Sequence, residues 1–295
     1  MTPTVWADIG AGISGAVGVR FEAVSHSAIG GGCINQCYRL AGRNRSYFVK
    51  VNAPDRRAMF EAEATGLSEI AATATVRVPA PICRGANAEA SWLVLEYIEL
   101  AQAKSGSMSK LGAGLASLHR VTQSEFGWIS DNAIGSTPQL NTRCGDWLEF
   151  WRKHRLGYQL ALAAKNGAPS SLLAKGERLA RDFAPLLADC AIKPALLHGD
   201  LWGGNAGFEA GGSPVVFDPA VYYGHHEADL AMTELFGGFD ADFYAAYRAA
   251  MPLDPGYRAR RDLYNLYHVL NHYNLFGGGY ARQAEAMVDR LLAEI

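Results

Sequence analysis

The sequence predicts an α+β protein with two lobes, in which an antiparallel sheet occupies the first third and the remainder is mostly helical. Two observations lead to this prediction. Before residue 98, β-branched and aromatic residues concentrate in short runs that glycine, proline and polar residues separate. Beyond that point, apolar residues recur mainly at helical spacing. We therefore place a boundary near Ile98 and expect an N-terminal lobe over 1–98 and a C-terminal lobe over 99–295.

Composition narrows the class of protein. The 295 residues suffice for two lobes with a substantial core, and 49% hydrophobic with 19% charged residues is the balance of a globular protein. The formal net charge of −2, without a long run of either sign, argues against nucleic acid or an anionic membrane as the main partner. No apolar stretch has the length of a membrane span, and the start is not that of a signal peptide. The five cysteines are scattered without a C-x-x-C pair, which favours a reducing cytoplasm and neither a disulfide framework nor a zinc site.

The first lobe is predicted to begin with a short helix over 4–17 and a meander of three strands over 21–29, 34–40 and 46–51. The residues that separate the first two strands are Gly30, Gly31, Gly32 and Cys33. Glycine has no Cβ, so such a loop can bring backbone N–H groups close to phosphate oxygens. A hairpin that is glycine-rich for purely steric reasons is the alternative.

Lys50 lies in the third run, between Val49 and Val51, which share the opposite face of the strand. A lysine on a central strand is out of place unless an anion meets it, whereas on an edge strand it would guard against aggregation. The next segment, 56–72, is predicted to be helical. Glu63 falls on the side of this helix that should face the sheet, so it can pair with Lys50, while we expect Glu61 to be solvated.

The strongest strand of the first lobe is expected over 91–98, after a rigid, proline-containing entry. Small and polar residues over 103–109 indicate a linker. In the second lobe, helices are predicted over 110–120, 146–164, 170–187, 239–250 and 258–276. His119 ends the first of them, where a histidine more often caps a helix than catalyses a reaction.

Two short apolar runs, at 196–197 and 215–217, each deliver a carboxylate where the run ends. Asp200 follows the first run, Asn205 comes five residues later, and Asp218 follows the second. Phosphoryl transfer needs one carboxylate that faces the attacking hydroxyl and two oxygen ligands that hold Mg²⁺ against nucleotide phosphates. The order and spacing are those of the kinase H-x-D-x-x-x-x-N and D-F-G motifs, with Pro219 after the second Asp. A hairpin whose Asp and Asn residues only build turns is the alternative.

Adjacent His225 and His226 could suggest a metal site, but neighbouring residues point to different faces of a helix or strand, so we do not expect ligation there. Asp229 lies 11 residues after Asp218. We interpret it as an acid at a helix N-terminus that braces the catalytic loop.

Taken together, these residues resemble the fructosamine-3-kinase (ketosamine-3-kinase) family, whose members share the two-lobed protein-kinase-like fold of aminoglycoside phosphotransferases. The resemblance covers nearly the whole chain. It is carried by G-G-G-C-I-N at 30–35, F-V-K-V-N at 48–52, M-F-E-A-E at 59–63, L-H-G-D-L-W-G-G-N at 197–205, D-P-A at 218–220, Y-G-H at 223–225, F-G-G-F at 236–239 and L-N-H at 270–272.

The resemblance implies that 1–98 is the nucleotide-binding lobe and that 99–295 is the catalytic and substrate lobe. It also implies ATP-dependent phosphorylation of the 3-hydroxyl of a ketosamine, free or protein-bound, as a step in deglycation. It implies that Asp200 is the catalytic base, that Asn205 and Asp218 hold Mg²⁺, and that Lys50 with Glu63 forms the ion pair that positions phosphate.

For the nucleotide, the resemblance implies phosphate contacts from Gly30, Gly31 and Gly32, a gatekeeper at Leu95, and adenine contacts along the hinge formed by Glu96, Tyr97 and Ile98. Trp202 is the predicted platform for the sugar face, with a core aromatic as the alternative. The other groups expected near the acceptor are aromatic and neutral, which suits one sugar ring rather than a polycation: Tyr222, Tyr223, His225 and His226.

Two other functions remain open at this point. The first is a kinase of an aminoglycoside, choline or another amino alcohol, and the second is a nucleotide-binding pseudokinase. The intact set of Lys50, Asp200, Asn205 and Asp218 argues against the pseudokinase. We also hypothesise that oxidation or alkylation of Cys33, beside the triglycine turn, inhibits the enzyme, with an inert small residue that fills the hairpin as the alternative. The sequence does not indicate the oligomeric state.

Overall fold

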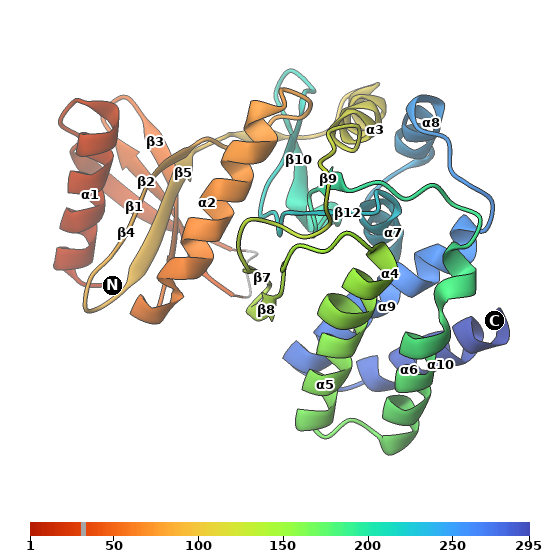
Figure 1. Cartoon of the computed structure of the whole chain (residues 1–295). Coiled ribbons are helices and arrows are strands. Elements are labelled where there is room, and N and C mark those ends of the chain that lie inside the picture. The colour runs from red at the N-terminus through yellow and green to blue at the C-terminus, as the bar shows by residue number, and fades with distance from the viewer. Residues whose placement is uncertain (31–33) are drawn as a thin grey trace. The chain divides into compact units, whose positions relative to one another are not determined.

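The structure is a computed structural model that describes residues 1–30 and 34–295 (Figure 1). The chain forms two compact units. The first consists of Met1–Ser107 and Gly207–Asp218, and the second of Met108–Ala206 and Pro219–Ile295. The first unit therefore extends beyond the boundary predicted at Ile98, and a later segment of the chain returns to it. The predicted α+β class, with an antiparallel sheet in the first unit and a mostly helical second unit, is confirmed.

The core of the first unit is a five-stranded antiparallel sheet with the order β1-β2-β3-β5-β4. Its strands are β1 (Ala23–Ile29), β2 (Gln36–Gly42), β3 (Ser46–Asn52), β4 (Pro81–Ala86) and β5 (Ser91–Glu96). The strand that carries Lys50, β3, lies at the centre of this order. The alternative in which Lys50 guards an edge strand is therefore excluded.

Helices α1 (Pro3–Val17) and α2 (Arg57–Ala72) cover opposite faces of this sheet (Figure 1). A short 3₁₀ turn, Pro54–Arg56, leads into α2. On one face, α1 buries Ile9 and Ile13 in a core cluster that includes Val49 and Val51. Because side chains alternate along a strand, Lys50 points to the other face, toward α2.

The segment that returns to the first unit forms a small sheet with the order β11-β10-β6. These strands are β6 (Leu100–Ala101), β10 (Ala206–Glu209) and β11 (Pro214–Val216). Phe208 pairs with Ala101, and Arg77 forms a bridge with Val215. These pairings explain why the unit extends past Ile98, and they leave Asp218 two residues beyond the end of β11.

The second unit is mostly helical. Its helices are α3 (Ser107–Leu118), α4 (Trp147–Trp151), α5 (Tyr158–Lys165), α6 (Ser170–Asp182), α7 (Glu227–Leu235), α8 (Ala241–Ala250), α9 (Tyr257–Phe276) and α10 (Tyr280–Ala293). A 3₁₀ turn, Ala184–Leu187, follows α6. Helix α9 is the centre of the unit, because α5, α7 and α10 all pack against it. Helix α10 was not predicted from the sequence, and a π-helical segment at Arg152–Gly157 divides the single helix predicted over 146–164.

Short strands complete the second unit. They are β7 (Asn132–Ile134) with β8 (Thr137–Gln139), and β9 (Ala195–Leu197) with β12 (Tyr222–Gly224). Strand β9 contains the first of the two apolar runs and leads directly to the predicted catalytic loop. No helix within the described ranges is long and apolar enough to cross a membrane.

Candidate active site

In the first unit, Lys50 forms two ion pairs. Its Nζ lies 2.6 Å from Glu63 Oε1 on α2 and 2.5 Å from Asp218 Oδ1 after β11. The Lys50 side chain is 3% exposed and that of Glu63 is 10% exposed, whereas that of Asp218 is 46% exposed. The predicted Lys50–Glu63 pair is thus present, and Asp218 presents part of its carboxylate to solvent. Glu61 instead pairs with Arg57 one turn away on the surface of α2.

The charges of this triad depend on one another. Burial alone would lower the pKa of Lys50, but the neighbouring Asp218 and Glu63 carboxylates raise it above its ordinary value. Burial raises the pKa of Glu63, and the Lys50 ammonium opposes that rise. A permanently charged ammonium is therefore held in a desolvated position by two acidic groups. Such a group can hold a phosphate with little loss of side-chain freedom.

Asp218 also has an unusual backbone. Its φ is 58°, and Ala74 is the one other non-glycine residue with a positive φ among those described. The left-handed region costs a non-glycine residue energy and is found at functional sites when the surroundings enforce it. Here the ion pair with Lys50 holds the side chain of Asp218 in this conformation.

The hinge residues lie where β5 ends. Leu95 is buried, and the backbone N–H of Glu96 donates to the Ala80 carbonyl. The Glu96 carboxylate pairs with Arg77 at 2.7 Å, and Arg77 also pairs with Glu209 at 3.1 Å. Arg77, Glu96 and Glu209 line a cavity of about 430 Å³. Its remaining lining residues are Tyr97, Ile98, Glu99, Ala210 and Gly211. Adenine contacts at 96–98 stay a prediction.

Gly30 is exposed at the end of β1, and the space around it is open. The predicted phosphate contacts of Gly31 and Gly32, and the hypothesis about Cys33, lie outside the described residues.

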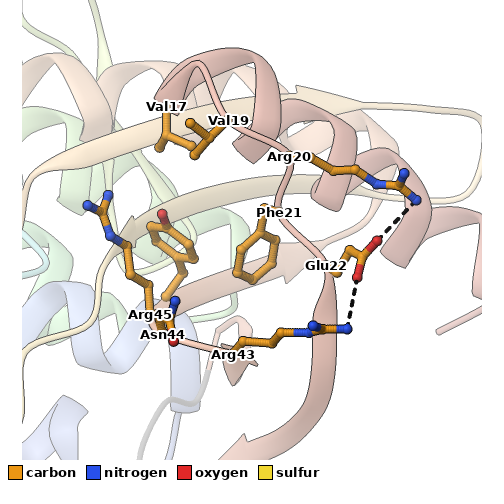
Figure 2. A pocket seen from close by; sticks show the side chains of 9 residues that line it. Val17, Val19, Arg20, Phe21, Glu22, Arg43, Asn44 and Arg45 are labelled. Atoms are coloured by element: carbon orange, nitrogen blue, oxygen red, sulfur yellow. Dashed lines mark ion pairs between the residues drawn. The ribbon is translucent and has the colours of Figure 1, made fainter.

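Another cavity of the first unit, about 480 Å³, contains none of the predicted site residues (Figure 2). Glu22 in its wall pairs with Arg20 at 3.1 Å and with Arg43 at 3.7 Å. Its remaining lining residues are Val17, Val19, Phe21, Asn44, Arg45 and Tyr47.

In the second unit, the candidate base Asp200 is tied to Asn205. The Asn205 amide nitrogen donates to the Asp200 carbonyl at 2.9 Å and to Asp200 Oδ2 at 3.2 Å. Asn205 is buried, and this arrangement leaves its Oδ1 as the atom that could ligate a cation. The spacing of five residues thus brings the two side chains together, and their roles as base and Mg²⁺ ligand stay predictions.

The loop itself depends on Gly199. Its φ is +84°, and a Cβ at this position would lie 1.9 Å from the Ala220 carbonyl oxygen. The Ala220 N–H in turn donates to the His198 carbonyl. Only glycine fits this close approach of two chain segments.

Asp229 at the start of α7 braces the loop, as predicted. Its Oδ2 accepts from the backbone N–H of His198 at 2.6 Å and its Oδ1 from that of Gly199 at 2.8 Å. Burial would raise the pKa of Asp229, but its hydrogen bond to His119 and the nearby backbone donor lower it below the usual value. His119, interpreted above as a helix cap, is instead buried in this network between Asp229 and the Tyr247 hydroxyl.

The predicted acceptor residues divide into two groups. Trp202 is 39% exposed, which excludes the core-aromatic alternative. His225 is fully buried and bonded through Nδ1 to the Tyr264 hydroxyl at 2.6 Å, so the prediction that it contacts substrate is wrong in this structure. Tyr222 and Tyr223 are buried as well. The exposed ring beside Trp202 is that of Phe236, to which the sequence assigned no role.

The side chains of His225, His226 and Glu227 do come together, contrary to expectation, with ligand atoms within 4.8 Å of one another. Both carboxylate oxygens of Glu227, however, accept from the Arg260 guanidinium, at 2.6 and 2.8 Å. The negative charge that a cation would need is thus already paired, and we assign no metal to this cluster.

Replacing Gly199 by alanine should disrupt the loop. We expect G199A to lose most activity and to unfold at a lower urea concentration, because both the positive φ and the Ala220 carbonyl oppose a Cβ. Gly145, where an added Cβ would meet no atom within 4 Å, provides the control, and G145A should behave like the unchanged protein. A G199A variant with unchanged activity and stability would contradict this account.

The buried histidines predict acid sensitivity. Burial lowers the pKa of His225, His226 and His268, to about 3 for the latter two. Between pH 7 and 5.5 the unfolded chain takes up protons at these side chains and the folded chain does not. Stability should therefore fall as the pH drops below about 6.5, by up to about 1.4 kcal/mol per pH unit for each histidine. Urea unfolding at the two pH values measures this loss, and His226→Asn should make it smaller. A pH dependence identical in that variant would overturn the explanation.

The sequence of this chain is similar to those of known kinases. The family model described as fructosamine kinase matches residues 5–294. A probable ketoamine kinase of Synechocystis is 47% identical over 99% of this chain and 98% of its own length. A chloroplastic protein-ribulosamine 3-kinase of Oryza sativa subsp. japonica is 46% identical over 90% of this chain and 78% of its own length.

Solved structures agree in fold. A Haemophilus somnus protein assigned as a fructosamine-3-kinase superposes with a TM-score of 0.89 at 27% identity, over 97% of each chain. The choline kinase LicA of Streptococcus pneumoniae shares the fold at a TM-score of 0.67 and 16% identity, over 99% of this chain and 100% of its own. The expected protein-kinase-like fold is confirmed, and the chain belongs to the fructosamine kinase family.

Proposed function

We propose that the chain transfers the γ-phosphoryl group of ATP to the 3-hydroxyl of a ketosamine such as a fructosamine or ribulosamine. The observation that carries this proposal is the buried Lys50 ammonium held by Glu63 and Asp218. An isolated buried cation is costly, and a kinase uses such a lysine, fixed by a glutamate of the neighbouring helix, to hold nucleotide phosphates.

Asp218 and Asn205 fit the requirements of Mg²⁺ ligands. The Asp218 carboxylate is partly exposed, and the Asn205 amide nitrogen is bonded to Asp200, so that Oδ1 is the atom to offer a cation. Both are oxygen donors, which Mg²⁺ prefers. When bound there, the ion would neutralise charge that develops on the phosphates.

Asp200 is the proposed proton acceptor for the sugar hydroxyl. Its orientation is fixed by the amide of Asn205, and the backbone before it is fixed by Asp229. A base held in place lowers the entropic part of the barrier. Trp202, exposed two residues further on, is the proposed platform for the sugar.

The proposed acceptor gives the reaction a chemical purpose. A phosphate on C3 stands next to the C2 ketone, so it can leave once C1–C2 enolises. The amine is then released, which is deglycation. The names of the relatives, ketoamine kinase and protein-ribulosamine 3-kinase, support this acceptor class, free or protein-bound.

We propose a reducing cytoplasm as the compartment. Cys37, Cys83 and Cys190 are unpaired in the structure, and burial raises the pKa of each thiol to about 11, which suits cysteines that stay reduced and unreactive.

Asp200→Asn tests the proposal. With a fructosamine as acceptor, turnover should fall by about 10²–10⁴, because an amide cannot accept the hydroxyl proton. ATP affinity should stay within a few-fold, because the nucleotide is assigned to the first unit. Asp182→Asn, at the surface end of α6, is the matched control and should keep full turnover. Near-normal turnover in a folded D200N variant would refute the role of Asp200.

A further inference from the structure

Five aromatic rings of the second unit follow one another from the catalytic loop outward. The Trp202 and Phe236 rings meet edge to face with centroids 6.4 Å apart, and Phe236 lies 4.8 Å from His272. His272 in turn lies 5.7 Å from Phe276 and 5.2 Å from Tyr280. We call these five residues the aromatic strip. It runs from Trp202 to the end of α9 and the start of α10.

Three of the five rings of the strip are exposed, and His272 and Tyr280 are half-buried. Trp202, Phe236 and Phe276 are 39%, 40% and 55% exposed, and they are the exposed Trp and Phe residues of the part of the chain that the structure describes. Exposed aromatic rings that gather at one place usually mark a binding surface, whereas scattered ones do not. The exposed Trp and Phe rings gather here.

Glycines fix the inner end of the strip. A Cβ on Gly204 would lie 2.2 Å from the Trp202 ring, so the indole packs directly over this residue. A Cβ on Gly238 would lie 2.8 Å from the Gly203 Cα, which shows how closely the segment 236–239 crosses the catalytic loop. The F-G-G-F motif thereby sets Phe236 beside Trp202. Loop and strip form one continuous surface.

The aromatic strip begins next to Asp200, the proposed base. The backbone N–H of Trp202 donates to the Asp200 carbonyl at 3.2 Å, so the strip begins in the turn that holds the proposed base. In a ketosamine, the nitrogen is attached to C1, two carbons from the reacting C3 hydroxyl. A sugar that lies on Trp202 with C3 at Asp200 holds its nitrogen two carbons from the reacting hydroxyl, and the substituent on that nitrogen can extend over Phe236, the ring in contact with Trp202.

We propose that Phe236, His272, Phe276 and Tyr280 bind the apolar substituent on the ketosamine nitrogen, a proposal that rests on the proposed function. Aromatic faces attract a secondary ammonium and bury carbon atoms of its substituent. The strip contains no carboxylate, which a ligand with several ammonium groups would need. The surface thus selects ketosamines of amines with one charge and an apolar body, including the four-carbon chain of a lysine.

Steady-state kinetics with three fructosamines tests this assignment: those of methylamine, benzylamine and Nα-acetyl-lysine. Phe276→Ala should raise KM for the benzylamine adduct by about 5- to 10-fold, the effect of losing one well-packed aromatic contact. The acetyl-lysine adduct should respond in the same direction. KM for the methylamine adduct, which does not reach Phe276, should stay within about twofold, and kcat should be unchanged throughout.

Ile129→Ala, at a side chain 72% exposed and outside the strip, is the control and should leave all three KM values unchanged. If F276A is poorly folded, F276L keeps an apolar side chain and should still lower the preference for benzylamine over methylamine. Equal changes for all three adducts in either variant would overturn the subsite while the kinase function stands. Failure of the unchanged enzyme to phosphorylate any of them would instead overturn the proposed function and the subsite with it.

Discussion

The buried charge of Lys50 is the constraint on which the first unit depends. An ammonium on a central strand, 3% exposed, would be strongly destabilising without its carboxylates. One of them comes from α2, and the other comes from a segment more than 150 residues later that returns to this unit. Asp218, at the end of this segment, has a positive φ. The sheet order places Lys50 on a central strand, the position of α2 supplies Glu63, and the returning segment supplies Asp218.

In the second unit, the main constraint is the rigid conformation of the short loop from His198 to Asn205. Asp229 takes two successive backbone N–H groups, Gly199 permits contact with Ala220, and Asn205 fixes the Asp200 carboxylate. His119 and Tyr247 extend this support into the core. Groups held in place before the substrate arrives need no reorganisation during the reaction, which is the main source of catalytic power in such sites.

Sequence reasoning succeeded where spacing determines geometry. The alternation around Lys50 predicted its face, and the position of Glu63 predicted its partner. The two apolar runs predicted the strands that precede Asp200 and Asp218, whose roles stay predictions. It failed where burial depends on distant partners. His225 lies in the core because Tyr264 of α9 meets it, and His119 supports the loop because Asp229 comes from α7. The boundary at Ile98 was placed too early because strand pairing between β6 and β10 is long-range. Phe236 and His272 were visible as motifs, but only their ring contacts suggest a role.

The central claim is that this chain phosphorylates a ketosamine and is neither a nucleotide-binding pseudokinase nor an aminoglycoside kinase. Phosphorus NMR of one reaction with ATP, a fructosamine and kanamycin in equal amounts tests it most directly. The account predicts a single new phosphate ester, on C3 of the fructosamine, that decays to inorganic phosphate while the free amine appears. A phosphate ester on kanamycin alone, a stable fructosamine ester, or no ester at all would contradict it.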